Sequence, residues 1–281
     1  MNINFKQALL VLPLIIISCS NSDPNVNKTD NVIEEKVSYN QVGEFFYNEF
    51  MECKTGPDYG KDTLIQMMSE WRELGLSTDL LGSWSYSPAL KDSGLEEDLL
   101  QWELQWTSKE AADSAWSDWQ QDEDAQQWSE KYQSVLQCNE GNRSPWTFIF
   151  PYDPEAFGEF DKAGYFASSF SACNFNEGKS NEDLKLSIAL YSSWLDSLEK
   201  NIGTYSYGLY FPAFQTNEVD FWFGNFHESF QTMEEGNLLW ENSGADAKKS
   251  LESTATCQTA NLFNSQVLYD HSSKHCYKVS N

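Results

Sequence analysis

Two spacings of hydrophobic residues divide the chain into elements. Alternation of apolar and polar residues predicts strands at 44–53, 82–90, 98–106, 145–151, 164–173, 204–214, 218–227 and 260–269. Apolar residues at every third or fourth position predict helices at 63–76, 108–137, 181–199 and 229–256. Thr107 with Glu110, and Ser180 with Asp183, have capping-box spacing at two of the helix starts. The order strand, helix, strand, strand, helix, strand therefore occurs twice.

The two series of elements match each other residue by residue. Aromatic residues and cysteines recur at offsets of 119 to 124 residues: Phe46 with Phe166, Phe50 with Phe170, Cys53 with Cys173, Tyr86 with Tyr210, Trp102 with Trp222, and Cys138 with Cys257. The offset changes only where loops are expected. Ordered matches of this kind indicate a tandem duplication, with one repeat at 39–153, a second at 154–270 and a tail at 271–281.

The element order of each repeat is that of the ferredoxin-like βαββαβ unit. The sheet of such a unit carries helices on one face only, so its other face must be covered. We therefore predict an α+β fold in which two ferredoxin-like repeats pack sheet to sheet as a fused α+β barrel. Over residues 40–270 this arrangement resembles the dimeric α+β barrel superfamily in its fused form. The resemblance rests on element order and repetition, because the sequence holds no catalytic motif of that superfamily.

Four cysteines occupy equivalent places in this predicted topology. Cys53 ends the first strand and Cys138 ends the second helical region, at the same edge of the sheet. Cys173 and Cys257 hold the same places in the second repeat. We therefore predict the disulfides Cys53–Cys138 and Cys173–Cys257, with four buried free thiols as the alternative. Cys276 is left without a partner.

Strand alternation nominates a lining for the barrel. We place Phe46 and Phe50, which both repeats share, beneath the helices, so that the opposite parity with Tyr47 and Glu49 faces the interior. Alternation alone does not assign the faces of the third strand. An eight-stranded barrel has room for side chains or one small ligand. The candidate pocket residues are Tyr47, Glu49, Tyr86, Trp102, Tyr210, Trp222 and His227, and we assign no catalytic residue.

The first residues resemble an export signal of bacterial lipoproteins. Lys6 precedes an apolar stretch at 8–18, and Ile16, Ile17 and Ser18 lead to Cys19 in the pattern of a lipobox. The resemblance implies that residues 1–18 are removed and that Cys19 carries the lipid. An ordinary cleaved signal is the alternative. By the same resemblance, Ser20 rather than Asp after the cysteine implies sorting to the outer membrane. Residues 19–38 have the composition of a flexible tether.

The net charge and the three histidines bear on which partners and metal sites the chain could have. The chain has 18 Lys and Arg against 43 Asp and Glu, which argues against nucleic acid as a partner. His227 ends a strand beside Glu228. His271, His275 and Cys276 lie in a polar tail, and we assign no metal site.

We favour an envelope-anchored lipoprotein whose barrel binds a small molecule or a protein partner without catalysis. Its ligand, its cofactor and its oligomeric state are left open. The alternative is an α+β barrel enzyme, because that superfamily includes cofactor-poor monooxygenases and haem-handling enzymes. A haem would need His227 as its axial ligand. A third hypothesis is a purely structural barrel with a filled interior.

Overall fold

The computed structural model describes residues 43–89, 99–161 and 164–273, which belong to one compact unit, Lys36–Asn281. Its first repeat comprises β1 (Phe45–Thr55), α1 (Lys61–Glu73), β2 (Leu80–Pro88), β3 (Leu99–Trp106), α2 (Lys109–Gln121), α3 (Glu123–Lys131), β4 (Leu136–Cys138) and β5 (Ser144–Ile149). The second comprises β6 (Tyr165–Phe175), α4 (Asn181–Ser197), β7 (Tyr205–Pro212), β8 (Phe221–His227), α5 (Phe230–Ser243), α6 (Ala245–Thr254), β9 (Ala255–Cys257) and β10 (Asn261–Asp270). The predicted order is confirmed, except that each second helical region is two helices followed by a short strand.

Eight long strands within the described residues close into an antiparallel barrel. The hydrogen-bonded order runs β10, β2, β3, β1, β5, β7, β8, β6, and β6 pairs with β10 to complete the ring. Each repeat contributes four neighbouring strands. The repeats join where β5 pairs with β7 and where β10 pairs with β2. The predicted fused α+β barrel is therefore confirmed, and each of its eight long strands in the described residues is paired on both sides.

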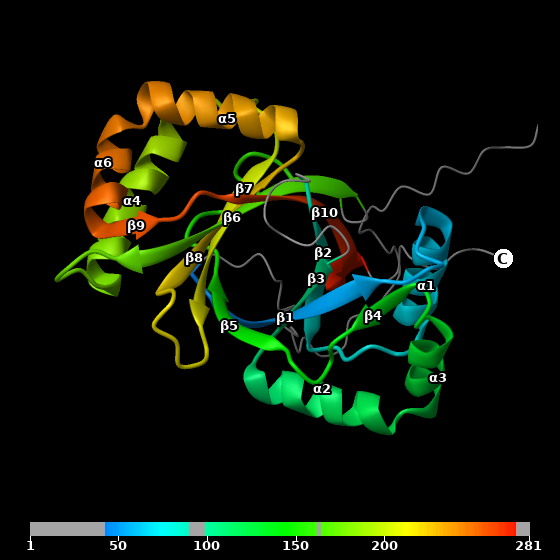
Figure 1. The fold of residues 1–281 in the computed structure, drawn as a ribbon. Coiled ribbons are helices and arrows are strands. Elements are labelled where there is room, and N and C mark those ends of the chain that lie inside the picture. Colours follow the sequence, from blue (N-terminus) through cyan, green and yellow to red (C-terminus); the bar gives the residue numbers. More distant parts are fainter. Residues whose placement is uncertain (1–42, 90–98, 162–163, 274–281) are drawn as a thin grey trace, which may run out of the picture. The chain divides into compact units, whose positions relative to one another are not determined.

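Helices cover the outside of the barrel. Helix α1 buries Met67, Met68 and Trp71, and α4 buries Leu184, Ile188 and Tyr191 among others, at the spacing of one helical face. Burying one such side chain contributes about 1.5–3 kcal/mol, so these stripes hold both helices on the strands. Figure 1 shows α1, α2 and α3 beside the strands of the first repeat and α4, α5 and α6 beside those of the second. Among the described residues, no helix has the length and hydropathy that crossing a bilayer requires.

The predicted N-terminal cap of α4 is confirmed, and that of α2 is wrong by one residue. Ser180 and Asp183 form the capping box of α4. The cap of α2 is Ser108 rather than Thr107, because the Ala111 N–H donates to the Ser108 hydroxyl at 3.1 Å. A one-residue shift of this kind leaves the buried face of the helix unchanged.

Both predicted disulfides are present. Cys53 of β1 is bonded to Cys138 of β4, and Cys173 of β6 is bonded to Cys257 of β9. Within each pair the cysteines lie directly opposite each other on antiparallel strands. The sequence predicts that Cys138 and Cys257 end a helix; each lies instead in the short strand that follows it.

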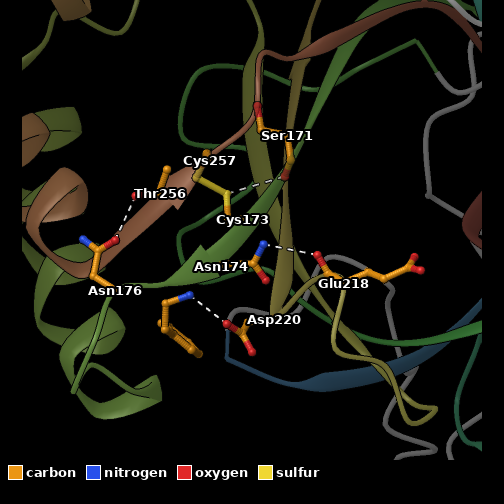
Figure 2. The surroundings of a disulfide bond; sticks show 9 residues. Ser171, Cys173, Asn174, Asn176, Glu218, Asp220, Thr256 and Cys257 are labelled. Carbon is orange, nitrogen blue, oxygen red and sulfur yellow. Dashed lines mark hydrogen bonds between the residues drawn. A yellow bond between two sulfur atoms is a disulfide. The ribbon is translucent and has the colours of Figure 1, made fainter.

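The neighbourhood of the second disulfide joins several segments. Figure 2 shows that the Thr256 hydroxyl donates to Asn176 Oδ1, at 2.8 Å, and that Asn174 Nδ2 donates to the Glu218 carbonyl, at 3.1 Å. These contacts tie β9 and the segment before β8 to the end of β6, so the disulfide sits at a junction of three segments.

The predicted faces of the strands are partly wrong. Phe46 and Phe50 lie in the aromatic cluster inside the barrel, whereas Tyr47 and Met51 pack beneath the helices of the first repeat. A closed barrel removes its interior from water on every side. The aromatic residues that both repeats share therefore fill that interior rather than the helix-covered face.

The offset between the repeats is also different for the third strands, β3 and β8, from the one predicted. Cys53 pairs with Leu100 and Cys173 pairs with Phe221, so β3 and β8 are related by 121 residues rather than 120. Trp102 therefore corresponds to Phe223, and Glu103 corresponds to Gly224. Because a shift of one residue reverses the face of every side chain in a strand, Trp102 and Trp222 lie on opposite sides of the barrel wall.

Candidate functional site

We call the whole interior of the barrel the lumen. One half of the lumen is filled with aromatic rings. The rings of Tyr86 and Phe170 meet edge to face with centroids 5.2 Å apart. Phe50 packs against Tyr210 with ring centroids 5.6 Å apart, and Trp222 stacks on Trp146 with centroids 4.4 Å apart. These contacts make this half of the lumen a solid core.

The other half of the lumen keeps a cavity of about 90 Å³. Its walls come from both repeats. Its buried polar side chains include Asn48 of β1, Glu103 and Gln105 of β3, and Ser206 of β7. The aromatic side chains include Phe148, Phe150, Tyr210 and Phe226. A wall shared by both repeats is what the binding hypothesis requires.

The alternation of β3 places its polar residues in the lumen. Trp102, Leu104 and Trp106 pack beneath the helices, so the residues between them point inward. Gln105 lies opposite Asn48 of β1, and Glu103 lies opposite Phe50. The three polar side chains therefore share one patch of the wall.

Glu103 is fully buried and accepts hydrogen bonds from two strands. Asn48 Nδ2 donates to Glu103 Oε1 at 2.5 Å, and the Tyr86 hydroxyl donates to Oε2. Burial raises the pKa of Glu103 to about 7, and hydrogen bonds from Tyr86, Asn48 and Tyr210 offset part of that rise. Burial raises the pKa of Tyr86 and Tyr210 well above 10, so both phenols keep their protons. The cluster therefore contains one group that titrates near neutrality.

Two neighbouring amides have hydrogen-bonding groups without a partner in the described part of the chain. These groups are the amide nitrogen and oxygen of Gln105 and Oδ1 of Asn48. Gln105 is 0% exposed and Asn48 is 1% exposed. Leaving one buried polar group unsatisfied costs about 1–3 kcal/mol, so such groups point to a bound polar molecule or ordered water.

Three of the seven predicted pocket residues, Tyr86, Tyr210 and Trp222, do face the lumen. The prediction is wrong for Tyr47 and Glu49, which lie on the helix side of β1. Glu49 accepts a hydrogen bond from Trp116 Nε1 at 2.7 Å and pairs with Arg143 at 3.0 Å. It joins β1 to α2 and to the segment before β5.

Trp102 and His227 also lie outside the lumen. The Trp102 ring packs edge to face on Trp71 at 5.2 Å, beneath α1. The His227 ring lies 4.7 Å from that of Tyr205, in a cavity of about 220 Å³ between the sheet and α5. Burial lowers the pKa of His227 to about 4. His227 is therefore a neutral buried side chain outside the lumen.

The surroundings of His227 do not fit a haem. Haem needs an axial ligand with open space on the ring side. The cavity of about 220 Å³ beside His227 is smaller than the roughly 300–1,000 Å³ of pockets for ligands of that class. The described residues contain no cluster of three His, Cys, Asp or Glu that could hold a metal ion. His275 and Cys276 lie outside the described residues.

A larger cavity, here called the outer cavity, lies between the sheet and the helices of the first repeat. It measures about 850 Å³, and six of its lining residues are tryptophans, among them Trp116, Trp119 and Trp128. Trp116 Nε1 donates to Glu49, and Trp128 Nε1 donates to the Met67 carbonyl at 3.0 Å. Several of its polar groups are thus already used by the protein. Other lining atoms, among them Trp106 Nε1 and Ser129 Oγ, have no hydrogen-bond partner in the described part of the chain. The lumen cavity differs in holding a fully buried carboxyl group, that of Glu103, beside amides that are unpaired among the described residues.

Sequence reasoning missed Asn48, Glu103 and Gln105 as a site. A signal for two of them was present, because Gln101, Glu103 and Gln105 alternate with Trp102, Leu104 and Trp106. In a strand covered by helices, the wholly apolar row must face those helices, which leaves the polar row for the lumen. No comparable signal marked Asn48.

No protein-family model matches the chain, and no curated protein matches it either. Some solved structures are similar at low identity. A mutant chlorite dismutase from Candidatus Nitrospira defluvii in complex with cyanide has a TM-score of 0.47 and 12% identity, covering 83% of this chain and 94% of that chain. An anthrone oxidase-like protein has a TM-score of 0.43 and 9% identity, covering 80% of this chain and 94% of that chain. The fold assignment above rests on strand pairing, and these likenesses carry no conclusion about function.

Proposed function

We propose that the barrel binds a small molecule in its lumen and that Glu103 exchanges a proton with it. The observation that carries this proposal is the patch formed by Glu103, Asn48 and Gln105. Its carboxyl group titrates near pH 7, and its amides have groups without a partner among the described residues. This arrangement favours the barrel enzyme over the non-catalytic binder.

The chemistry follows from the pKa of the carboxyl group. An acid or base works best when its pKa lies near the working pH, and burial brings Glu103 to about 7. The phenols of Tyr86 and Tyr210 stay protonated and donate to the carboxylate, which stabilises it once it has released its proton. Such a site needs side chains alone, as in an enzyme of the cofactor-poor kind.

Native mass spectrometry of the chain, purified from cells that naturally produce it, tests this function. We expect a small non-covalent adduct that is absent after denaturation. Gln105→Leu should lose the adduct, because leucine offers no hydrogen bond. Trp119→Ala, which alters only the outer cavity, is the matched control and should keep it. Loss in the control with retention in Gln105→Leu would place the ligand in the outer cavity and refute the proposal.

Proton exchange is tested separately on the ligand that this experiment identifies. In wild-type protein, hydrogen exchange or turnover of that ligand should follow a titration near pH 7. Glu103→Gln keeps the size of the side chain but cannot ionise, so the rate measured at saturating ligand should fall at least 100-fold. An unchanged rate would leave a non-catalytic binder.

We also propose, from the sequence, that a lipid on Cys19 anchors the barrel in the bacterial envelope, most simply at the outer membrane. Residues 1–42 lie outside the described residues, so this proposal rests on the lipobox. Cells fed an alkyne-labelled fatty acid should label the wild-type chain, and the chain should sediment with membranes. Cys19→Ser should lose both properties. Labelling that persists in Cys19→Ser would show that the lipid is attached elsewhere, and an unlabelled wild-type chain would show that there is no lipid.

A further inference from the structure

The polar groups of the lumen cavity present hydrogen-bond acceptors to a ligand. Asn48 directs its amide N–H to Glu103, so its Oδ1 is the atom left over, and it has no partner in the described residues. The Gln105 amide also lacks a partner there and can turn its oxygen to the cavity. With the Glu103 carboxylate, these two oxygens form a set of three acceptors. An ammonium group has three N–H donors and no acceptor, and it is the complement of this set.

The rest of the cavity wall is aromatic. Phe148, Phe150, Phe160 and Phe226 line it, together with Tyr210. The faces of aromatic rings carry negative potential and attract cations, most strongly where water is excluded. A wall of this kind accepts the alkyl groups of an organic cation and its charge at the same time.

Carboxylates surround the entrance to the cavity. Glu155, Glu159 and Asp161, which follow β5, line the cavity and are exposed to solvent. Among the described residues that line it, none is a lysine or an arginine. The chain as a whole carries a formal net charge of −25. A cleft lined by charge of one sign concentrates ligands of the other sign, so this entrance attracts cations and repels anions.

We propose that the ligand of the lumen is a small organic cation with N–H donors, of the class of protonated alkylamines. This inference rests on the proposed function, and it names the chemistry that the lumen site accepts. The volume of about 90 Å³ limits the ligand to a few non-hydrogen atoms. The acceptors bind the ammonium group, the rings surround the alkyl part, and the carboxylates at the entrance raise the local concentration.

Cation binding is coupled to the proton on Glu103. The pKa of about 7 belongs to the lumen without a cation, and a bound ammonium group favours the ionised carboxylate. The other groups that face Glu103 are Asn48, which is neutral, and Tyr86 and Tyr210, which stay protonated. Affinity should therefore rise with pH and level off above pH 7. Each pH unit below 7 should weaken binding about tenfold.

Three probes of nearly equal shape test the charge preference: tert-butylammonium, tert-butanol and pivalate. Their binding to the purified full chain is measured by ligand-observed NMR and calorimetry at pH 6 and pH 8. At pH 8 we expect the ammonium probe to bind at least tenfold more tightly than tert-butanol, with no binding of pivalate. At pH 6 its affinity should be about tenfold lower. Glu103→Gln should weaken the cation at least tenfold and remove the pH dependence.

The matched control is Glu182→Gln, which removes one exposed carboxylate in the first turn of α4, outside the lining of the lumen cavity, and should bind as wild type. Gln105→Leu is a second lumen variant and should also lower the affinity for the cation. Two variants are used so that a folding defect in Glu103→Gln or in Gln105→Leu does not decide the test. If tert-butanol or pivalate binds as well as the cation and Glu103→Gln weakens it, the lumen is a site for another chemical class. If the cation binds equally to wild type and Glu103→Gln, it binds elsewhere. Both results overturn the cation inference while leaving the adduct experiment to decide the proposed function.

Discussion

Two buried groups with opposite pKa shifts give a quantitative test of the site. Burial raises the pKa of Glu103 from its ordinary 4.5 to about 7. Between these values the native state keeps a proton that the unfolded chain has released, so native stability falls as the pH rises through this window. The shift corresponds to about 3 kcal/mol lost between pH 4.5 and pH 7. Glu103→Gln removes this dependence because glutamine does not ionise.

His227 acts in the opposite direction. Its pKa is lowered from 6.5 to about 4, so between these values the unfolded chain holds a proton that the native state lacks. Native stability therefore rises with pH across this window, again by about 3 kcal/mol. The windows of Glu103 and His227 overlap between pH 4.5 and pH 6.5. In the wild-type protein the two pH dependences of the free energy of unfolding should therefore largely cancel. Each should be visible only when the other group is removed by a single substitution.

Urea denaturation followed by tryptophan fluorescence, repeated from pH 4 to pH 8, measures both effects. The free energy of unfolding of wild type minus that of Glu103→Gln should fall by about 3 kcal/mol from pH 4.5 to pH 7. The same difference taken against His227→Gln should rise by a similar amount from pH 4 to pH 6.5. The remaining carboxylates are common to all three proteins and cancel in each difference. A flat difference curve for Glu103→Gln would refute the buried, protonatable carboxyl group and the proton-exchange function with it.

Three further perturbations have expected outcomes. Replacing both cysteines of one disulfide by serine should lower the free energy of unfolding by roughly 4 kcal/mol on the chain-entropy estimate, and the two disulfides should give equal losses because their sequence separations are 85 and 84 residues. A Cβ on Gly208 would lie 2.1 Å from the Phe148 ring, so Gly208→Ala should cost about 1–3 kcal/mol in denaturant titration, whereas Gly141→Ala, with its nearest atom at 3.8 Å, should be nearly neutral. Gln105→Leu should raise the stability of the ligand-free protein by about 1–2 kcal/mol, because it removes polar atoms that have no partner in the described residues; a lower melting temperature would contradict this.

The architecture was predictable because the duplicated sequence shows the same pattern of strands and helices twice. Two weak sets of strand and helix patterns reinforced each other, and the cysteine pairs tested the resulting topology independently. The short strands β4 and β9 were not predictable, because three residues carry too little alternation to be recognised. The cysteine prediction survived this error, since Cys138 stays beside Cys53 whether a helix or a strand delivers it.

The candidate site was less predictable, for a reason that lies in the strand period. A strand has two faces, and any error of one residue exchanges them. The offset of 120 that relates β1 to β6 becomes 121 between β3 and β8, so Trp102 and Trp222 looked equivalent without being so. Buried aromatic residues occur on both faces of this barrel wall, so hydrophobicity could not reveal which face was the lumen. Strand pairing alone resolves it.

The corrected offset also shows how the polar patch of the first repeat differs from the equivalent positions of the second. With the corrected register, Asn48, Glu103 and Gln105 correspond to Ser168, Gly224 and Phe226 in the second repeat. A Cβ on Gly224 would come within 3.1 Å of Phe170 and Tyr210, so the glycine admits the rings that fill half of the lumen. A second carboxylate in the same low-dielectric interior would repel Glu103 and raise the cost of ionising either one. Divergence of the repeats therefore gave one copy the buried carboxyl group and the other the glycine that admits the rings packed around it.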